Sequence, residues 1–561
     1  MVPGRTFVLW RARVRKYDPV PVSPDYESTT RHHYNDVVDT FARDRLPPKE
    51  LWPRLHFDLP ELRYPARLNC ATALLDDAIP EGHGDRPAIL IDAGPITYAE
   101  LLERANRIAN VLKDAGVMPG NRVLLRGYNS PELYAAWLAV MKTGAIAVTT
   151  MPMLRAPELA AIIIKSEPAF ALSDHRLLME LRTAISAQGF VKTVISWGGG
   201  DLEGRMERAS DEFVNVSTAA DDVCLLAFTS GTTGQPKACA HFHRDVLAMA
   251  DVVGRHLLRT QPGDIYAGSP PLGFTFGLGA LLVFPLRFRA ATVPIETPTP
   301  ANILAAIEKY RVSCLFTAPF AYRALAGEVA GRDLSSLKRC VSAGEFLPKS
   351  VSDAWHEKTG IRIIDGIGAT EMIHIFISAE GSAIRPGATG KPLPGYRACV
   401  LDEACQPMPP GSTGYLAVTG PTGCRYLADE RQRDYVVAGW NVTGDLYRVD
   451  EEGYFWFIAR ADDMIVSAGY NIAGPEVEWA LLGHPAVREC AVVGAPDPER
   501  GTVVKACIVL APGRKGDEAL TRELQDYVKQ RIAPYKYPRV IEYLESLPKT
   551  ATGKLQRKAL R

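Results

Sequence analysis

Residues 97–148 alternate between helical and strand-like patterns, and this alternation most restricts the fold. Thr97 and Glu100 have the spacing of a capping box, in which each side chain satisfies a backbone donor at a helix N-terminus. Apolar residues then recur at helical spacing from Leu101 to Leu112. Short apolar strands and further helices follow in turn. Such alternation predicts a largely parallel sheet with helices on both faces.

The alternation continues to about residue 375. RVLL (122–125) and AIAV (145–148) read as buried strands, and Ser130-Pro131 begins the helix between them. Residues 385–458 differ, because Gly, Pro and short β-prone runs predict a small, mostly antiparallel region.

The C-terminal segment predicts a compact unit of its own. The charged stretch ARADD (459–463) lacks apolar periodicity and reads as a linker. Beyond it, helices are expected over 475–482 and 517–532, with strands near 489–493 and 505–510. The predicted fold class is α/β: a large N-terminal domain of parallel α/β layers plus a small antiparallel β region, followed by a small C-terminal α+β domain.

Length and charge exclude several classes of protein. The 561 residues are too many for one core of ordinary size, so at least two domains are expected. The 64 basic and 64 acidic residues cancel, which favours neither a nucleic-acid nor a membrane-surface partner. The ten cysteines form no CxxC pair, so a zinc site is not predicted, and reduced thiols in a cytoplasmic compartment are expected.

No membrane span is predicted, because the longest apolar stretches, such as residues 277–286, are far shorter than about 20 residues. The first 17 residues contain five basic residues and no acid. This composition weakly resembles a mitochondrial transit peptide, which makes the mitochondrial matrix an alternative to the cytoplasm. An extended N-terminus is the preferred interpretation.

Residues 229–237, TSGTTGQPK, read as a loop between two strands, and their composition indicates a phosphate site. Glycines let the backbone approach an anion, and successive N–H groups form a concave nest. Hydroxyl donors and Lys237 add to this anion-binding character. The loop is no P-loop, because that motif needs GxxxxGK[ST] at the start of a helix. A plain polar hairpin turn is the alternative.

With its neighbours, this loop resembles the phosphate-loop signature of the adenylate-forming superfamily, which contains acyl- and aryl-CoA ligases, adenylation domains and luciferases. The resemblance covers about residues 70–561. Its further motifs, in the order of the family, are SAGEFLP (342–348), DGIGATE (365–371), TGD (443–445), ARADDMIVSAGYNIAGPEVE (459–478) and PKTATGK (548–554).

The resemblance implies a site where a carboxylate attacks the α-phosphate of ATP, with Mg²⁺ as the metal and coenzyme A as a later co-substrate. Glu371 is the implied magnesium ligand, and Thr370 would contact the α-phosphate; both count as catalytic. The implied ATP/AMP-binding residues are Thr229, Ser230, Gly231, Thr232, Thr233, Gly234, Lys237, Gly344, Glu345, Phe346, Asp365, Gly366, Thr370, Asp445 and Arg460.

The resemblance also implies two half-reactions served by a rotating C-terminal domain. Lys554 is the implied catalytic lysine of adenylation, and Asp462 is the implied hinge between domains 1–460 and 462–561. After rotation, Ser467, Ala468 and Gly469 would serve the CoA step. Two departures from the family pattern are Asn471, where many acyl-CoA ligases carry Arg, and Ala459, where Gly is usual.

GIGATEMIHIFIS (366–378) and PLGFTFGLGALLVFPL (271–286) resemble segments of benzoate CoA ligases, and TTMPMLRAPELAA (149–161) resembles a segment of 2-aminobenzoate CoA ligases. The implied pocket residues are Thr275, Phe276, Gly344, Ile367 and His374. His241 and His243 could also face the pocket, although a lone histidine is more often structural. An aromatic wall can stack on an aryl acid, but it can also hold a medium alkyl chain. The expected order is therefore 2-aminobenzoate, then benzoate or a substituted benzoate, then medium-chain fatty acids.

Two other functions stay open at this point. A stand-alone adenylation protein that loads a carrier-protein thiol has a nearly identical core. A non-enzymatic nucleotide-binding protein is the third reading, which the intact Lys554 and Glu371 oppose. The expected partners are an aryl acid, ATP and CoA, with no nucleic acid and no membrane span, and a homodimer is considered.

Overall fold

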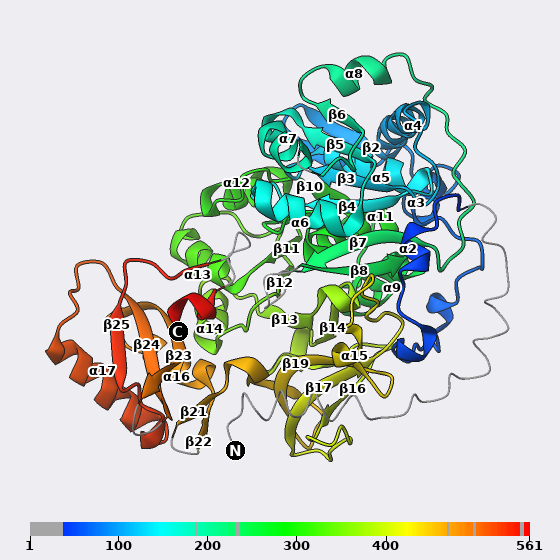
Figure 1. Cartoon of the computed structure of the whole chain (residues 1–561). Coiled ribbons are helices and arrows are strands. Elements are labelled where there is room, and N and C mark those ends of the chain that lie inside the picture. Colours follow the sequence, from blue (N-terminus) through cyan, green and yellow to red (C-terminus); the bar gives the residue numbers. More distant parts are fainter. Residues whose placement is uncertain (1–36, 187, 230–235, 468–469, 498–500, 550–554) are drawn as a thin grey trace.

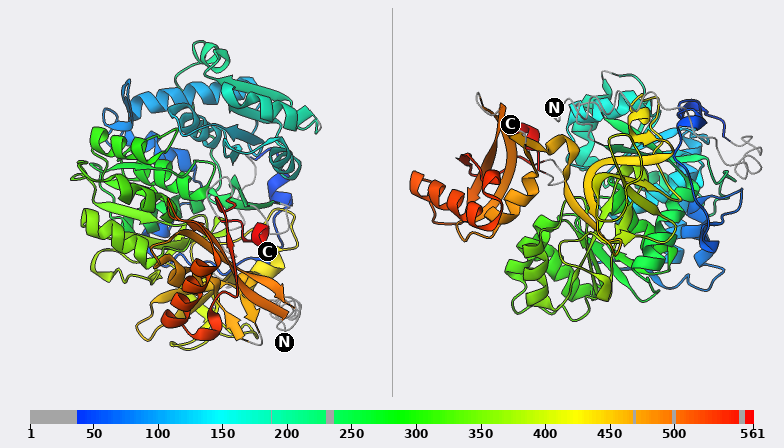
Figure 2. Two further views of the ribbon diagram at one scale, coloured as in Figure 1. Left: turned by 90° about the vertical axis from the view of Figure 1, so that its left-hand side faces the viewer. Right: turned by 90° about the horizontal axis from the view of Figure 1, so that it is seen from below.

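The computed structural model describes residues 37–561 except 187, 230–235, 468–469, 498–500 and 550–554. Two large sheets with helices between and outside them form most of the molecule, and a smaller C-terminal unit lies to one side (Figures 1 and 2). Within the described chain, no helix combines the length and the apolar character needed to cross a membrane.

The first large sheet has six strands in the order β6-β5-β3-β4-β7-β8. All its neighbours are parallel except β7 and β8, which form an antiparallel hairpin. Its strands are β3 (Arg122–Arg126), β4 (Ile146–Thr150), β5 (Phe170–Asp174), β6 (Thr193–Trp197), β7 (Val223–Thr229) and β8 (Lys237–Phe242).

The second large sheet has nine strands in the order β15-β14-β13-β12-β11-β9-β10-β1-β2. Its middle strands are parallel, and both of its ends are antiparallel. Its strands are β1 (Pro87–Ile91), β2 (Gly94–Thr97), β9 (Ile265–Gly268), β10 (Ala291–Val293), β11 (Cys314–Thr317), β12 (Arg339–Ser342), β13 (Ile363–Gly368), β14 (Ile375–Ser378) and β15 (Lys391–Pro392).

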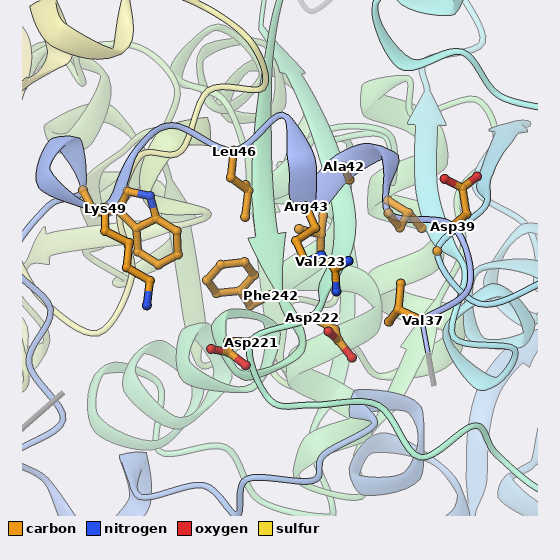
Figure 3. Close-up of a pocket in the computed structure, with 13 residues that line it drawn as sticks. Val37, Asp39, Ala42, Arg43, Leu46, Lys49, Asp221, Asp222, Val223 and Phe242 are labelled. Atoms are coloured by element: carbon orange, nitrogen blue, oxygen red, sulfur yellow. The ribbon is translucent and has the colours of Figure 1, made fainter. Parts of the chain in front are cut away.

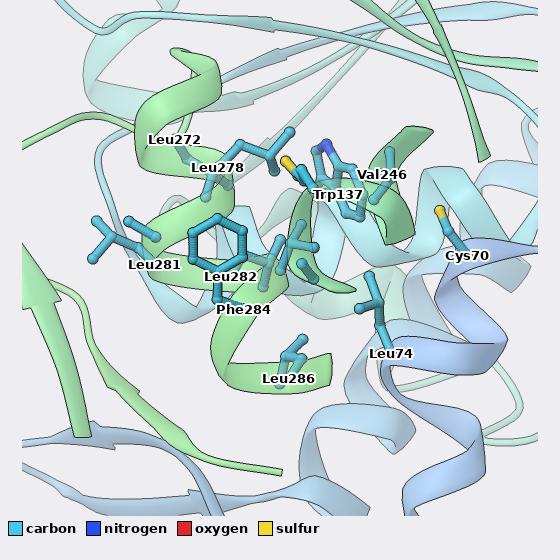
Figure 4. Packing of buried hydrophobic residues seen from close by; sticks show 14 of the residues in the cluster. Cys70, Leu74, Trp137, Val246, Leu272, Leu278, Leu281, Leu282, Phe284 and Leu286 are labelled. Atoms are coloured by element: carbon cyan, nitrogen blue, oxygen red, sulfur yellow. The ribbon is translucent and has the colours of Figure 1, made fainter. Parts of the chain in front are cut away.

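The main hydrophobic core lies between these two sheets. The helices of this layer bury apolar side chains there (Figure 4). Trp137 of α5 and Phe284 of α11 are fully buried in this layer. Its helices are α3 (Cys70–Leu74), α4 (Tyr98–Asp114), α5 (Pro131–Lys142), α9 (His243–Met249), the π-helical segment Ala250–Leu257, α10 (Thr275–Leu278), the π-helical segment Gly279–Val283 and α11 (Phe284–Arg287).

Further helices cover the outer faces, so that the large unit has five alternating layers of helix and sheet. One group packs on the six-stranded sheet and the other on the nine-stranded sheet. The outer helices are α6 (Ala156–Ser166) and α7 (Leu178–Ser186) on the first sheet, and α12 (Pro300–Tyr310), α13 (Pro319–Glu328) and α14 (Lys349–Thr359) on the second. The short helices α2 (Phe41–Asp44) and α8 (Asp201–Met206) lie outside these layers.

Residues 397–460 form the antiparallel region that their Gly- and Pro-rich composition predicts. Its elements are β16 (Arg397–Leu401), β17 (Thr413–Thr419), α15 (Gln432–Tyr435), β18 (Val436–Val437), β19 (Trp440–Val449) and β20 (Phe455–Arg460).

The C-terminal unit mixes helices and mostly antiparallel strands around its own small core. The predicted α/β fold class is thereby confirmed, whereas the division at Asp462 and the mobility of this unit stay predictions. The elements are β21 (Ile465–Ser467), β22 (Tyr470–Ile472), α16 (Gly474–Leu482), β23 (Val487–Asp497), β24 (Gly501–Leu510), α17 (Glu518–Arg531) and β25 (Val540–Tyr543).

Local signals explain where the helices of the first unit begin and end. The capping box of Thr97 and Glu100 is present at the start of α4, with the Glu100 backbone N–H donating to Thr97 Oγ1 over 3.2 Å. Beyond the end of this helix, Gly116 has φ +93°, a conformation that glycine adopts without strain. Ser130 caps α5, and its hydroxyl accepts the Leu133 N–H over 3.3 Å.

We predict that Ser130→Ala lowers the free energy of unfolding by about 1 kcal/mol, because the N-terminal donor at Leu133 loses its partner. Chemical denaturation measures this change. Ser130→Asp keeps a capping oxygen and should retain most of the stability. Equal losses in both variants would contradict the capping role.

Candidate active site

The hairpin of β7 and β8 positions Lys237 at the edge of the six-stranded sheet. Thr229, the last residue of β7, pairs with Lys237, the first residue of β8. The phosphate-loop candidates between them lie outside the described residues; they are Ser230, Gly231, Thr232, Thr233 and Gly234. The predicted strands on either side of the loop are confirmed, so the loop joins two antiparallel strands and does not open a helix.

Lys237 meets Glu371 and Tyr426 at the centre of the candidate site. Its ammonium lies 3.3 Å from Glu371 Oε1 and donates to the Tyr426 hydroxyl over 2.5 Å. The same hydroxyl donates to Glu371 Oε1. Glu371 is 7% exposed. Three segments far apart in the sequence thus share one buried, charged hydrogen-bond network.

This network keeps Glu371 ionised. Burial by itself raises the pKa of a carboxyl group, but Lys237 and the Tyr426 hydroxyl oppose burial and hold the pKa of Glu371 below its ordinary value. Burial and the neighbouring Glu371 charge raise the pKa of Tyr426, so the phenol stays protonated and able to donate. The result is a buried carboxylate beside an ammonium, next to the predicted phosphate loop.

The predicted nucleotide residues of the TGD and ARADD motifs come together across two paired strands. Asp445 of β19 pairs in register with Arg460 of β20, and Arg460 Nη1 lies 3.0 Å from Asp445 Oδ1. Asp445 is buried, whereas the Arg460 side chain is 42% exposed. The guanidinium therefore orients the carboxylate and still reaches solvent.

Five further predicted nucleotide residues lie on two other segments of the large unit. Phe346 stacks on Phe457 with ring centroids 5.4 Å apart. Gly344 has φ +90° and open space where a side chain would begin, and the Glu345 charge acts on Arg557 of the C-terminal unit. On β13, the partly exposed Asp365 is followed by the buried Gly366.

Desolvation raises the pKa of Asp365 to about 8, although a backbone hydrogen bond from Gly366 partly opposes this increase. A carboxyl group with this pKa is mostly protonated at pH 7, so it can donate a hydrogen bond as well as accept one.

The predicted pocket residues contribute to an aromatic wall. Phe276 and the Thr275 beside it are buried in α10, and the Phe276 ring lies 5.5 Å from His374. Phe284 packs edge-on to His374, with centroids 4.7 Å apart. Burial lowers the pKa of His374 to about 3, so its imidazole is neutral. Ile367 lies on β13 and is partly buried against the same core.

Of the predicted C-terminal residues, only some are described. Ser467 is buried at the end of β21, and Asp462 is exposed in a short turn with its carbonyl accepting from Arg561. Ala468, Gly469 and the catalytic candidate Lys554 lie outside the described residues.

A second buried network includes Arg425, the residue that directly precedes Tyr426. Arg425 Nη1 donates to Asp245 Oδ2 over 2.8 Å, and neither side chain is exposed to solvent. The fully buried His241 lies between this pair and the Glu371 turn, with its Nε2 2.8 Å from the Thr370 carbonyl oxygen. His241 was a lesser candidate for the acid pocket beside a structural role, and its described contacts are with this carbonyl and with Asp245.

His243 belongs to a separate cluster. Its Nδ1 accepts the Cys70 backbone N–H over 3.1 Å. Cys70, Cys224 and His243 have their potential ligand atoms within 4.8 Å of one another, all of them buried. Spacing arguments could not find this group, because its members are 154 and 19 residues apart in a chain without a CxxC motif. The hydrogen bond already occupies the imidazole nitrogen that faces the thiols.

The hollow drawn in Figure 3 lies away from the Glu371 network. Phe242 lines it, and strand alternation points Phe242 to the face of β8 opposite Lys237 and His241. Its charged lining residues are Asp39, Arg43, Lys49, Asp221 and Asp222. This hollow is therefore not the candidate site.

Tyr426 is the contact residue that sequence reasoning missed. It lies in GCRYLAD, between two strands of the antiparallel region, and a lone tyrosine there carries no chemical signal. Its bridge to Cys239, which lies two residues after Lys237 on β8, helps to bring the phenol to Glu371.

We predict that Asp245→Ala costs about 3–5 kcal/mol of unfolding free energy, because it leaves the Arg425 guanidinium buried without its partner. Denaturant unfolding at pH 7 measures the loss. Asp353→Ala, which removes a surface ion pair with Lys349, should change stability little. If Asp245→Ala lost no more unfolding free energy than Asp353→Ala, the Asp245–Arg425 pair would not be stabilising.

The same pair has a defined pH dependence. Although burial raises the pKa of Asp245, Arg425 together with smaller contributions from neighbouring groups outweighs burial, and the pKa falls to about 2, from an ordinary 3.8. The contribution of Asp245 to stability is thus present above about pH 4 and lost as pH falls toward about 2. The difference in stability between wild type and Asp245→Ala should shrink over that window.

Comparisons with known proteins agree with this architecture. The family model described as AMP-binding enzyme matches residues 76–426, and that of the AMP-binding enzyme C-terminal domain matches residues 476–554.

The chain is 34% identical over 515 residues to the benzoate–CoA ligase of Thauera aromatica, covering 90% of this chain and 97% of that protein. It is 35% identical to the mitochondrial acyl-coenzyme A synthetase ACSM3 of Rattus norvegicus, covering 83% of each chain. The crystal structure of the anthranilate CoA ligase AuaEII with anthranoyl-AMP has a TM-score of 0.85 and 34% identity, covering 90% of this chain and 98% of that one. The protein therefore belongs to the AMP-binding enzyme family.

Proposed function

We propose that the protein is an ATP-dependent, AMP-forming aryl-acid:CoA ligase, with 2-aminobenzoate as its first candidate substrate and benzoate or a substituted benzoate next. The observation that carries the proposal is the buried Lys237–Tyr426–Glu371 network beside the predicted phosphate loop. Such a network presents an anchored positive charge and an ionised carboxylate to a polyphosphate, which adenylation requires.

The reaction has two steps. A carboxylate oxygen of the acid attacks the α-phosphorus of ATP, forming an acyl-adenylate and releasing pyrophosphate. The thiol of CoA then attacks the acyl carbonyl carbon and loses its proton, and AMP leaves. Lys237 would hold the outer phosphates in the first step, while Thr370 and the loop hydroxyls would contact the phosphate oxygens.

The residues present fit Mg²⁺ as the metal. Magnesium is held in ATP enzymes by one or two carboxylates together with phosphate oxygens and water. Glu371 supplies a carboxylate kept ionised by its neighbours, and only its Oε1 is engaged by Lys237 and Tyr426. When bound, the metal would neutralise charge on the phosphates. Tyr426 and Lys237 would fix the direction in which the carboxylate points.

The nucleoside would lie beside Asp445, whose carboxylate can accept both ribose hydroxyls and is held by Arg460. The Phe346 ring, stacked on Phe457, would lie along the adenine, with Gly344 leaving room beside it. Asp365 and Gly366 would approach the same base.

An aryl acid suits the described wall. Phe276 and His374 present flat rings 5.5 Å apart, and the His374 imidazole is neutral. His374 Nδ1 is buried and has no hydrogen-bond partner among the described residues. An ortho-amino group would satisfy that nitrogen, whereas an alkyl chain would not. This favours 2-aminobenzoate over a medium-chain fatty acid, the alternative that fits the likeness to ACSM3.

The C-terminal unit would serve both steps. Lys554 would bridge the acid carboxylate and the α-phosphate during adenylation, and rotation about Asp462 would exchange it for the segment Ser467, Ala468 and Gly469 in the CoA step. A stand-alone adenylation protein that loads a carrier thiol is a second candidate, since its core is nearly identical. The homodimer and the cytoplasmic location stay predictions.

We predict that pyrophosphate release is fastest with 2-aminobenzoate, slower with benzoate and slowest with medium-chain fatty acids. A panel of acids, assayed with ATP and Mg²⁺ with and without CoA, measures this order. CoA thioester formation separates the ligase from a carrier-loading protein. Faster turnover of an alkyl acid than of every aryl acid would refute the substrate assignment.

We predict that Lys554→Ala slows acyl-adenylate formation by roughly 10²–10³, the effect of losing one charge contact in the transition state. Thioester formation from supplied acyl-adenylate should survive, because the lysine would have left the site by then. Lys558→Ala is the control, since it removes a nearby lysine outside the TGK motif. Equal loss in both half-reactions would remove Lys554 from the adenylation role.

A further inference from the structure

The turn that carries Glu371 is strained. Thr370–Met372 form a single 3₁₀ turn between β13 and β14, and Ile373 follows with φ +64° and ψ −34°. Positive φ is unfavourable for a β-branched residue. Such backbone conformations cost about 1–3 kcal/mol and persist only where surrounding contacts hold them. The position of Glu371 therefore depends on whatever holds this turn.

Side chains from two other segments hold the carbonyl groups of the turn. The Thr422 hydroxyl donates to the Met372 carbonyl over 2.9 Å. His241 Nε2 lies 2.8 Å from the Thr370 carbonyl oxygen. A carbonyl oxygen only accepts, so Nε2 carries the hydrogen and donates it. That carbonyl belongs to the peptide bond that joins Thr370 to Glu371.

Two side chains on one face of β8 contact Glu371 or the peptide bond that precedes it. Side chains alternate along a strand, so Lys237, Cys239 and His241 point to the same side. Lys237 contacts the Glu371 carboxylate, and His241 contacts the peptide before it. The strand thus fixes both the charged end and the backbone of the same residue.

Asp245 lies beside the other ring nitrogen of His241, at a distance too long for a hydrogen bond. His241 Nδ1 faces Asp245 Oδ2 at 3.8 Å, and Asp245 is paired with Arg425. Arg425 directly precedes Tyr426, whose hydroxyl donates to Glu371. Of these two consecutive residues, Tyr426 contacts the Glu371 carboxylate directly, and Arg425 pairs with the Asp245 that lies beside His241.

We propose that His241 is a positioning residue for Glu371: its Nε2–H fixes the Thr370–Glu371 peptide and thereby the direction in which the carboxylate meets a divalent cation. The inference deepens the proposed function and rests on it for the identity of the cation and the nucleotide. His241 touches neither of them. Groups that orient a metal ligand in this way are commonly worth 10–100-fold in metal affinity or activity.

Two amide variants test the hydrogen bond itself. In His241→Gln the side-chain NH₂ reaches the place of Nε2 and can still donate to Thr370, whereas in His241→Asn it stops near the place of Nδ1 and cannot. Both variants carry the same amide group, and only the length of the side chain differs. We expect His241→Gln to stay within about threefold of wild type, and His241→Asn to need about 10–100-fold more Mg²⁺ for half-maximal pyrophosphate release. Thioester formation from supplied acyl-adenylate should be unchanged in both.

His241→Phe and His243→Phe form the matched control pair. Both remove a buried histidine from the same chain segment, but His243 contacts Cys70 and not the turn. Both should lose stability, and only His241→Phe should shift the Mg²⁺ dependence. Equal Mg²⁺ dependence in His241→Phe, His241→Asn and His243→Phe would overturn the proposal, as would a His241→Gln variant as defective as His241→Asn.

A structural readout separates this inference from the proposed function. Crystal structures of His241→Asn and His241→Gln should show the Glu371 turn displaced in the first and retained in the second. An undisplaced turn in His241→Asn refutes the positioning role, whatever reaction the enzyme catalyses. If the wild-type protein releases no pyrophosphate with any acid, the proposed function is refuted instead. The displacement of the turn in the crystal structures would still decide the role of His241.

Discussion

The contact of Lys237 with Glu371, to which the Tyr426 hydroxyl also binds, is the interaction on which the rest of the site depends. A carboxylate that is 7% exposed stays ionised only if nearby groups replace the water it has lost. Lys237 comes from the six-stranded sheet, Glu371 from the edge of the nine-stranded sheet, and Tyr426 from the antiparallel region. The network therefore exists only where all three parts of the large unit meet.

Close packing and buried ion pairs surround this network. The helices between the two sheets bury mainly apolar side chains, and their close packing fixes the separation of the sheets. One charged pair near the site, Asp245 with Arg425, is fully buried. A buried pair is costly to form and costly to break, so it defines one geometry and disfavours others. The strained turn at Ile373 can persist in such surroundings.

Sequence reasoning was most successful where the signal is local. The capping box at Thr97, the cap at Ser130 and the hairpin around the phosphate loop depend on neighbours within a few residues. The sequence motifs pointed to Lys237, Glu371, Asp445 and Arg460 as site residues. In the structure they form two ion pairs, Lys237 with Glu371 and Arg460 with Asp445. His241 was offered as a pocket residue, because the sequence does not say which face of a buried strand meets which loop.

The sequence alone determined the α/β class, the order of its elements and the family, because periodicity, caps and motif order are properties of short segments. Only the tertiary structure decided that the Tyr426 hydroxyl donates to Glu371, that His241 donates to the Thr370 carbonyl, and that two cysteines and His243 meet in the core. These contacts join residues 55, 129 and up to 173 positions apart. They follow from how sheets and loops pack against one another, and no local pattern in the chain encodes that packing.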